Sequence, residues 1–240
     1  MDALPRLCTV APEVFARFPD YRRGLVVAHG VRNGPASPEL VGLLREAEAS
    51  VRERLGGQDL VGHPRIASWR AAFKAMGIKP NDFRCSSEAM ARRALKDQLL
   101  PSINALVDIG NILSLRHLVP MGGHAIDHAA GSYDLRPATG RETFVPFGSD
   151  QMEHPEPGEI IFAEGDVVLT RRWSWRQANH SLTLPETTAI EFNVDALPPA
   201  SGEEAMAICG ELAELVARHC GGRIRLELLS PASPGASMEP

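Results

Sequence analysis

The chain has 240 residues, of which 44% are hydrophobic and 23% are charged, and its formal net charge is −5. These values are typical of a globular domain with a large core, and they exclude a disordered chain or a strongly basic nucleic-acid-binding protein. Any contact with nucleic acid must therefore come from a local basic patch, and its affinity should depend on salt.

The cysteine spacing predicts a reducing compartment, and the hydropathy of the chain predicts no membrane span. No C-x-x-C pair occurs among the four cysteines, which are Cys8, Cys85, Cys209 and Cys220. This pattern favours free thiols in the cytoplasm. No apolar run approaches the length of a transmembrane helix, and the opening MDALPRLCTV lacks the layout of a signal peptide. We therefore expect a cytoplasmic protein that has no membrane partner.

The first half of the chain is predicted to be mainly helical, after a strand over residues 24–29. Two of its helices carry apolar residues at helical spacing, over residues 38–55 and 66–76. Two further helices follow, and Pro101 separates them. The helix boundaries rest on caps, prolines and glycines, namely Ser37, Pro38, Gly56, Gly77, Pro80, Ser86 and Ser87.

The second half is predicted to be rich in strands, because short β-branched segments alternate there with Gly, Pro and Asp. These segments cover residues 143–147, 158–164, 166–172, 188–195 and 223–229. One late helix, over residues 203–219, interrupts them. We expect residues 1–229 to form one α+β domain, with mixed β-sheet structure flanked by helices. We expect the last stretch, residues 230–240, to be a flexible tail.

The fourth predicted helix carries polar residues on one side. Asn104, Asp108 and Asn111 are spaced four and three apart, so they share a face opposite an apolar stripe. Polar groups on such an apolar helix require hydrogen-bond partners, either in the protein or in a ligand. For Asp108 we favour a structural partner, since buried carboxylates are usually paired. For Asn111 we favour a ligand.

Several motifs resemble a known family when they are taken in order. The string INALVDIGN is similar to a V-D-x-x-N helix, and PMGGHAID to a P-M-H-A-F-D turn with one extra residue. Residues 171–192 resemble a Gly-Gly-Glu-His-Ser segment and the strand after it. Together with residues 69–77, 84–93 and 173–176, these motifs resemble the B3/B4 domain of the phenylalanyl-tRNA synthetase beta subunit. The likeness is strongest over residues 60–195, and the free-standing branch of the family is the closer match.

The resemblance implies a stand-alone, trans-editing hydrolase that binds the 3′ end of tRNA and cleaves mischarged aminoacyl esters. The implied partners are tRNA or aminoacyl-tRNA and an aminoacyl-tRNA synthetase, and no cofactor is implied. No G-x-S-x-G elbow is present, and aminoacyl esters are labile, so positioned water is expected to suffice. One alternative is a non-catalytic module that binds tRNA or an amino acid. Another is a hydrolase of small amides or esters.

The resemblance also implies catalytic roles for Asn111 and His124. Asn111 corresponds to an asparagine that lines the editing pocket, and Gly110 takes a neighbouring position that is usually threonine. His124 is the nearest match to the family's histidine, and a neutral imidazole can accept a proton from water or donate a hydrogen bond to an ester carbonyl. Gly122 and Gly123 would let backbone N–H groups approach a ligand.

Further substrate-binding residues are expected after residue 170. Trp173 and Trp175 would share one face of a strand, either as a pocket wall or as core residues. Asn179 aligns with the family's glutamate, which reads the phenolic hydroxyl of tyrosine, so tyrosine specificity is not expected here. His180 matches the family's histidine, although a strand-edge position would equally suit it.

Two further clusters have alternative interpretations. His124, Asp127 and His128 would bind zinc only on a helix and lack the usual glutamate, so no metal is expected. A basic helix face would contact tRNA or form intramolecular ion pairs, and its residues are Arg84, Arg92, Arg93 and Lys96.

Overall fold

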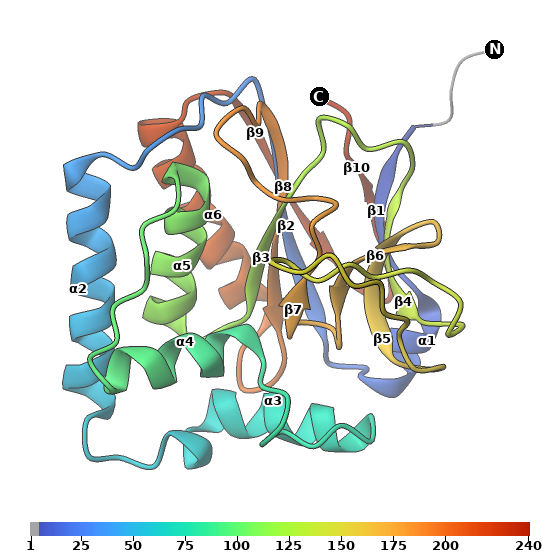
Figure 1. The fold of residues 1–240 in the computed structure, drawn as a ribbon, viewed down its shortest axis with the longest axis horizontal. Coiled ribbons are helices and arrows are strands. Elements are labelled where there is room, and N and C mark those ends of the chain that lie inside the picture. The colour runs from blue at the N-terminus through green and yellow to red at the C-terminus, as the bar shows by residue number, and fades with distance from the viewer. Residues whose placement is uncertain (1–4) are drawn as a thin grey trace.

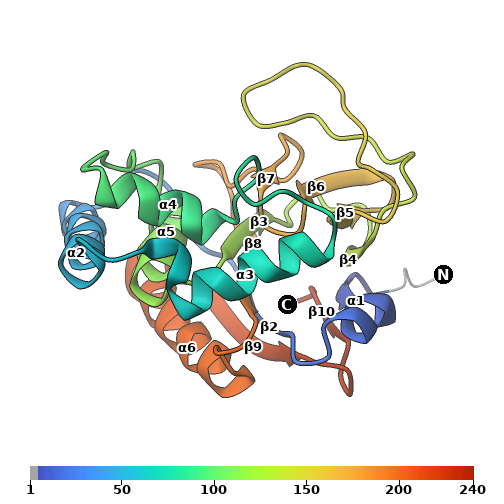
Figure 2. The same cartoon turned by 90° about the horizontal axis from the view of Figure 1, so that it is seen from below.

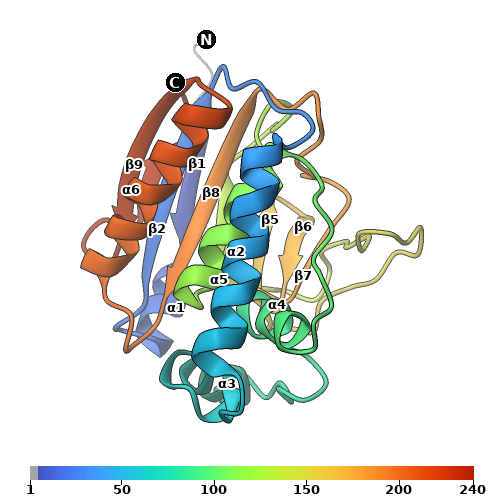
Figure 3. The same ribbon diagram turned by 90° about the vertical axis from the view of Figure 1, so that its left-hand side faces the viewer.

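The computed structural model describes residues 5–240, and two β-sheets pack face to face with helices on the outer side of one of them (Figure 1). The first sheet is antiparallel and has the order β3 (Met121–Ala125), β8 (Ala189–Ala196), β2 (Arg22–His29), β9 (Arg223–Leu229). Three helices form the layer beside it, namely α2 (Pro38–Leu55), α5 (Ala105–His117) and α6 (Gly202–His219). Figure 3 shows α2 and α6 in front of this sheet, with α5 between them.

The second sheet is mixed, because β1 runs parallel to β4 while the other neighbours are antiparallel. Its order is β10 (Gly235–Ser237), β1 (Leu7–Val10), β4 (Tyr133–Pro137), β5 (Ile160–Glu164), β6 (Val167–Arg171), β7 (Arg176–Gln177). The remaining helices are α1 (Pro12–Arg17), a 3-10 turn (Leu60–Gly62), α3 (Pro64–Ala75) and α4 (Ser86–Leu95). Seen from below, α3 and α4 lie across the ends of the sheets (Figure 2).

Two hydrophobic cores follow from this arrangement, and β2 contributes to both. Its Val26 and Ala28 pack against the helices, whereas Leu25 and Val27 face the second sheet. Adjacent residues of a strand point to opposite faces, so a strand buried on both sides is apolar throughout. A Cβ on Gly24 would lie 2.5 Å from the Cys209 sulfur, so α6 can pack this closely only over glycine.

The α+β class and the predicted helices of the first half are confirmed. Ser37 caps α2 by accepting a hydrogen bond from the Leu40 N–H, and Pro38 is the first residue of that helix. The late helix and the strands near residues 160, 167, 189 and 223 are also present. Residues 143–147 form only isolated bridges instead of the expected strand.

The predicted flexible tail at residues 230–240 is wrong. Residues Gly235–Ser237 form β10, which pairs with β1, and Met238 is fully buried. β1 was not predicted, so nothing in the sequence indicated a partner for this segment. Between residue 5 and residue 240, no helix is long and apolar enough to cross a membrane.

Candidate functional site

A cavity of about 120 Å³ opens between the two sheets. The first sheet contributes Arg23 from β2 together with residues of β3 and β8. The second sheet contributes Phe162, Thr170 and the turn between β6 and β7, and Ser86 at the start of α4 closes one side. Residues that are far apart in the sequence therefore meet where the sheets face each other.

Strand β8 provides acidic and amide groups on its cavity side. Glu191, Asn193 and Asp195 alternate with Ile190, Phe192 and Val194, which face the helices. All eight residues of β8 are buried, so the polar set is held between the sheets. The strand was predicted from the sequence, but its polar residues were not among the predicted site residues. The sequence does indicate a polar strand face, because Glu191, Asn193 and Asp195 alternate with residues that are all apolar.

His124 is held between a carboxylate and a hydroxyl. Its Nδ1 lies 2.7 Å from Glu191 Oε1 on β8, and its Nε2 lies 3.0 Å from Thr170 Oγ1 on β6. Only 2% of the His124 surface is exposed, and Glu191 is fully buried. An ionised carboxylate only accepts hydrogen bonds, so the Nδ1–H donates to Glu191. In the neutral imidazole, Nε2 then accepts a hydrogen bond from Thr170.

The glycines beside His124 serve close packing between strands. A Cβ on Gly122 would lie 2.8 Å from Asn193 Oδ1, and a Cβ on Gly123 would lie 2.9 Å from Phe192 Cε1. Both glycines belong to strand β3, so the Gly-Gly-His turn predicted from the sequence is wrong. Only Gly122 of the two lines the cavity, because Gly123 faces the helix side.

Arg23 and Asp195 form the charged floor of the cavity. Each is 1% exposed, and Arg23 Nη1 lies 3.6 Å from Asp195 Oδ1. The guanidinium carbon lies 4.3 Å from the centroid of the Phe162 ring, and Tyr21 donates a hydrogen bond of 2.5 Å to Asp195. Burial raises the pKa of Asp195, although Arg23 opposes that shift. Burial lowers the pKa of Arg23, but Asp195, with smaller contributions from Tyr21, Cys8 and Glu191, outweighs burial, and the pKa of Arg23 is raised.

Several polar atoms that line the cavity have no partner in the described part of the chain. They are Arg23 Nε, Ser86 Oγ, Trp173 Nε1 and Ser174 Oγ, and each is fully screened from solvent. Buried polar groups are nearly always hydrogen-bonded, because an unsatisfied donor costs about 1–3 kcal/mol. These donors therefore indicate a place for a polar ligand or for ordered water.

The turn after β6 carries two left-handed residues that are not glycine. Arg172 has φ +46° and Trp173 has φ +64°. Such backbone strain costs about 1–3 kcal/mol per residue and is concentrated at functional sites. The turn directs Trp173 into the aromatic core, with its ring centroid 5.0 Å from Trp69 and 4.8 Å from Tyr21. The strand predicted over these tryptophans is therefore wrong, and Trp173 is both core and cavity wall.

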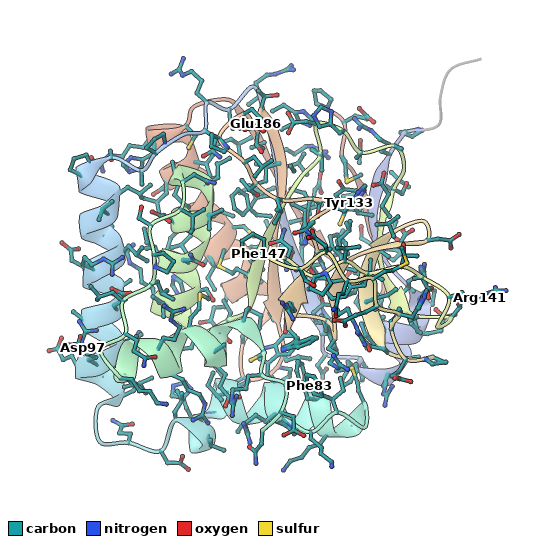
Figure 4. The ribbon with its side chains drawn as sticks, viewed as in Figure 1. Phe83, Asp97, Tyr133, Arg141, Phe147 and Glu186 are labelled. Carbon is teal, nitrogen blue, oxygen red and sulfur yellow. The ribbon has the colours of Figure 1, made fainter. Side chains whose placement is uncertain are left out.

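Trp175 lines the same cavity and also belongs to a stack with Phe83 and Arg172. The rings of Phe83 and Trp175 are 4.8 Å apart and nearly perpendicular. The Arg172 guanidinium carbon lies 3.7 Å from the Phe83 centroid and 4.6 Å from that of Trp175. Phe83 is labelled in Figure 4, close to α3 below the ends of the sheets. This stack has the composition of a site that binds an aromatic ring.

Asn111 and Gly110 do not reach this cavity. Both belong to α5, which packs on the opposite face of β3 and β8 from His124, and a Cβ on Gly110 would lie 3.7 Å from Phe192. Asn111 is partly exposed, and its side chain has no hydrogen bond within residues 5–240. The structure therefore does not bring together the two residues for which the resemblance implies catalytic roles, because the sheet separates Asn111 from His124.

The other polar residues of that helix have structural partners. Asp108 accepts hydrogen bonds from the Ile103 N–H and the Ser102 hydroxyl, which confirms its structural interpretation. Asn104 caps α5 by accepting from the Val107 N–H, and it donates to the Thr183 carbonyl. These contacts fix the loops before α5 and after β7.

Asn179 and His180 lie outside the cavity. Asn179 is exposed and donates to the Ser149 carbonyl, while His180 Nε2 lies 2.6 Å from Glu164 Oε2. The residue of this segment that lines the cavity is Gln177, whose amide donates to the Gly123 carbonyl at 3.1 Å. Strand β7 ends at Gln177 and the chain then leaves the cavity, so Asn179 and His180 do not line it.

The alternative zinc set does not converge. His124 is on a strand and bonds to Glu191, whereas Asp127 accepts from the backbone N–H groups of Thr188 and Ala189. His128 is exposed. Over residues 5–240, no group of three His, Cys, Asp or Glu side chains is placed to bind a metal.

The basic residues of α4 are partly engaged within the protein. Glu88 is fully buried, and its Oε1 lies 2.8 Å from Arg70, 2.8 Å from Arg92 and 3.9 Å from Arg84. The intramolecular alternative therefore applies to Arg84 and Arg92. Arg93 donates to the Leu99 carbonyl, and Lys96 is exposed. Figure 4 shows Asp97 where α4 ends beside α2.

Comparisons of the sequence and of the structure each found a similar protein. The chain is 30% identical over 111 residues to the phenylalanine–tRNA ligase beta subunit of Mycoplasma genitalium, and the match covers 45% of this chain and 13% of that protein. The chain thus spans a small part of this relative. A crystal structure of an N-terminal fragment of the phenylalanyl-tRNA synthetase beta-subunit from Pyrococcus horikoshii is similar over 94% of this chain and 53% of that one, with a TM-score of 0.45 and 11% identity. The model of the B3/4 domain matches residues 68–219, and the chain therefore belongs to the B3/4 domain family.

Proposed function

We propose that the chain hydrolyses aminoacyl esters of tRNA in trans, with the reacting ester in the cavity between the sheets. The observation that carries this proposal is the buried His124, which is fixed by Glu191 and faces a cavity with unpartnered polar donors. Membership of the B3/4 family and the relationship to a tRNA ligase subunit support the same reaction class.

The chemistry requires a base near an ester carbonyl. The Nδ1–H of His124 donates to Glu191, so the lone pair of Nε2, which faces the Thr170 hydroxyl, is the proton acceptor, and Glu191 stabilises the imidazolium that results. The unpartnered hydroxyls of Ser86 and Ser174 are donors available to the carbonyl oxygen. Aminoacyl esters are already labile. Holding the base and the hydroxyl donors beside the ester carbonyl is therefore expected to suffice for catalysis.

The stack of Phe83, Arg172 and Trp175 supports a nucleic-acid partner. Trp175 belongs both to the cavity wall and to the stack, so a ring bound there would be adjacent to the ester. Aromatic and arginine side chains bind unpaired bases by stacking, at about 1–3 kcal/mol per base. We assign this stack to the terminal base of tRNA. An aminoacyl-tRNA synthetase is a second proposed partner, which would deliver the tRNA.

One observation favours the alternative of a binding module for a free amino acid. Arg84 and Arg92 are paired with Glu88, and the chain carries a net charge of −5, so little free positive charge remains for tRNA on α4. A zwitterionic amino acid would instead use Asp195 and Arg23 at the cavity floor.

A panel of misacylated tRNAs tests the proposal. The chain is mixed with each aminoacyl-tRNA, and release of the amino acid is followed against the spontaneous rate. We expect accelerated release for at least one member. His124→Gln should lower that rate by about 100-fold or more, because an amide cannot act as a base.

His180→Gln is the matched control. His180 is exposed, bonds to Glu164 and lies outside the cavity, so its substitution should leave the rate unchanged. Retention of aminoacyl-tRNA without release would support the binding module. No effect on any tRNA, together with tight binding of a free amino acid, would overturn the proposed reaction.

A further inference from the structure

We propose that Thr170 is the nucleophile of this site, so that the acyl group is transferred to its hydroxyl before water releases it. This inference rests on the proposed ester hydrolysis and adds a covalent step to it. The carboxylate, imidazole and hydroxyl lie in one row, with Glu191 Oε1 2.7 Å from His124 Nδ1 and Thr170 Oγ1 3.0 Å from His124 Nε2. The second distance suits proton transfer from a hydroxyl nucleophile to its base, and the first suits a carboxylate that orients the base.

The direction of the hydrogen bonds makes Thr170 the donor. Glu191 is fully buried, and a carboxylate there can only accept a hydrogen bond, so it fixes the proton of His124 on Nδ1. The lone pair of Nε2 then points at the Thr170 hydroxyl. A water molecule that used the same lone pair would have to displace Thr170, which makes Thr170 the first group that His124 can activate.

The position of Thr170 also gives access to a substrate. The residue lies on β6, it is partly exposed, and it lines the same cavity as Ser86, Ser174 and Trp175. The three groups lie on three strands of two different sheets: His124 on β3, Glu191 on β8 and Thr170 on β6. Groups held on strands keep their geometry better than groups on loops.

The proposed reaction balances in two steps. Thr170 Oγ attacks the ester carbonyl carbon while His124 Nε2 takes the hydroxyl proton. The bond from the carbonyl carbon to the ribose oxygen breaks, and that oxygen leaves with the proton from Nε2. Water then attacks the threonyl ester, His124 takes a proton from the water, and the proton returns to Thr170 as the free amino acid leaves. Glu191 accepts the hydrogen bond from the His124 Nδ1–H in both steps and exchanges no proton.

The test uses the full chain and a fluorophosphonate probe, which forms a stable bond between phosphorus and an activated hydroxyl with loss of fluoride. Intact-protein mass spectrometry and peptide mapping locate the label. We expect one label at position 170 in the natural protein and in Thr170→Ser. We expect none in Thr170→Val, which keeps the shape of the side chain and removes the hydroxyl. Thr143→Val, at a partly exposed threonine that does not line this cavity, is the matched control and should still be labelled at Thr170.

Rates of deacylation complete the test, with thermal unfolding as the check that each variant is folded. Thr170→Val should lower hydrolysis of 4-nitrophenyl esters by about 100-fold or more, whereas Thr170→Ser should retain most of it. Wild-type rates in a folded Thr170→Val variant, or labelling elsewhere, would overturn the nucleophile while leaving the proposed function intact. Labelling of Thr170 without release of amino acids from any tRNA would instead support the nucleophile and overturn the tRNA substrate. Absence of both labelling and ester hydrolysis would overturn the nucleophile.

Discussion

Arg23 and Asp195 lie directly opposite each other on the neighbouring strands β2 and β8, and both are 1% exposed. Two charges in such a position stabilise the fold only as a pair, since each would otherwise be buried alone. Tyr21 and Asn193 complete the hydrogen bonds of the carboxylate. The same pair also lines the cavity, so a change to either residue should affect both the stability of the sheet and the shape of the cavity.

A double-mutant cycle should show this coupling. Asp195→Asn leaves the arginine buried without its counter-charge, and we expect it to lower the free energy of unfolding by about 3–5 kcal/mol. Arg23→Met should also destabilise, while the combined variant should lose less than the sum of the two changes. Urea denaturation of the four proteins measures the cycle. Strict additivity would mean that the pair is not energetically coupled.

A pair of glycine substitutions should separate close packing from free space. A Cβ at Gly122 would lie 2.8 Å from Asn193 Oδ1, so Gly122→Ala should cost about 1–3 kcal/mol by overpacking. Gly110→Ala is the control, since its nearest neighbour would be at 3.7 Å and alanine favours a helix by about 1 kcal/mol. Thermal unfolding should therefore show opposite signs for the two variants. A neutral Gly122→Ala would mean that β3 and β8 can separate without loss.

The local elements of this fold could be predicted because caps and periodicity are local. Ser37 with Pro38 began a helix, and a short β-branched run became β8. The cavity could not be predicted in the same way. Thr170 and His124 are 46 residues apart, and nothing in either local sequence specifies that β6 faces β3.

The site residues taken from the family resemblance had mixed outcomes for a physical reason. Gly122 and His124 lie on β3 of the first sheet, Trp173 and Trp175 lie on the turn between β6 and β7 of the second, and all of them line the cavity. Asn111 lies on a helix that covers the other face of the same sheet. Motif order does not reveal which face of a sheet a helix covers, so the two sets could not be told apart.

Glu142 should make stability depend on acid pH. Burial raises the pKa of this carboxyl, but its hydrogen bonds together, of which those from the Thr139 N–H and Arg136 are the largest, outweigh burial and lower the pKa to about 2. A folded pKa below the unfolded value gives stability that is present above the unfolded pKa and is lost as pH falls through the folded one. Stability should therefore fall progressively from about pH 5 to about pH 2.

Glu142→Gln measures this contribution. At neutral pH we expect the variant to be less stable by about 1–3 kcal/mol, the range for hydrogen bonds to a charged group. The difference from the natural protein should shrink as the pH approaches 2. Urea denaturation at several pH values provides the comparison, and a difference that stayed constant with pH would contradict the assignment.

The basic face of α4 should divide into structural and free charges. Arg92 contacts the fully buried Glu88, so Arg92→Ala should destabilise the protein by about 1–3 kcal/mol. Lys96→Ala, at an exposed position, should change stability by less than about 0.5 kcal/mol. If tRNA contacts this face, Lys96→Ala should also reduce the salt slope of binding. Equal stability of the two variants would show that the ion pair with Glu88 contributes nothing.

Specificity should depend on Gln177 and be independent of Asn179. Gln177 lines the cavity and donates to the Gly123 and Ser181 carbonyls, so Gln177→Ala removes a wall and should raise KM for any deacylated substrate. Asn179→Glu places a carboxylate at an exposed position beside Ser149, so the ratio of deacylation rates for tyrosyl- and phenylalanyl-tRNA should not change. A buried site discriminates a hydroxyl only through a partner that touches it, and Asn179 does not touch the cavity. A shift towards tyrosyl-tRNA in Asn179→Glu would show that this residue reaches the substrate, and the reacting ester would then have to lie outside the cavity between the sheets.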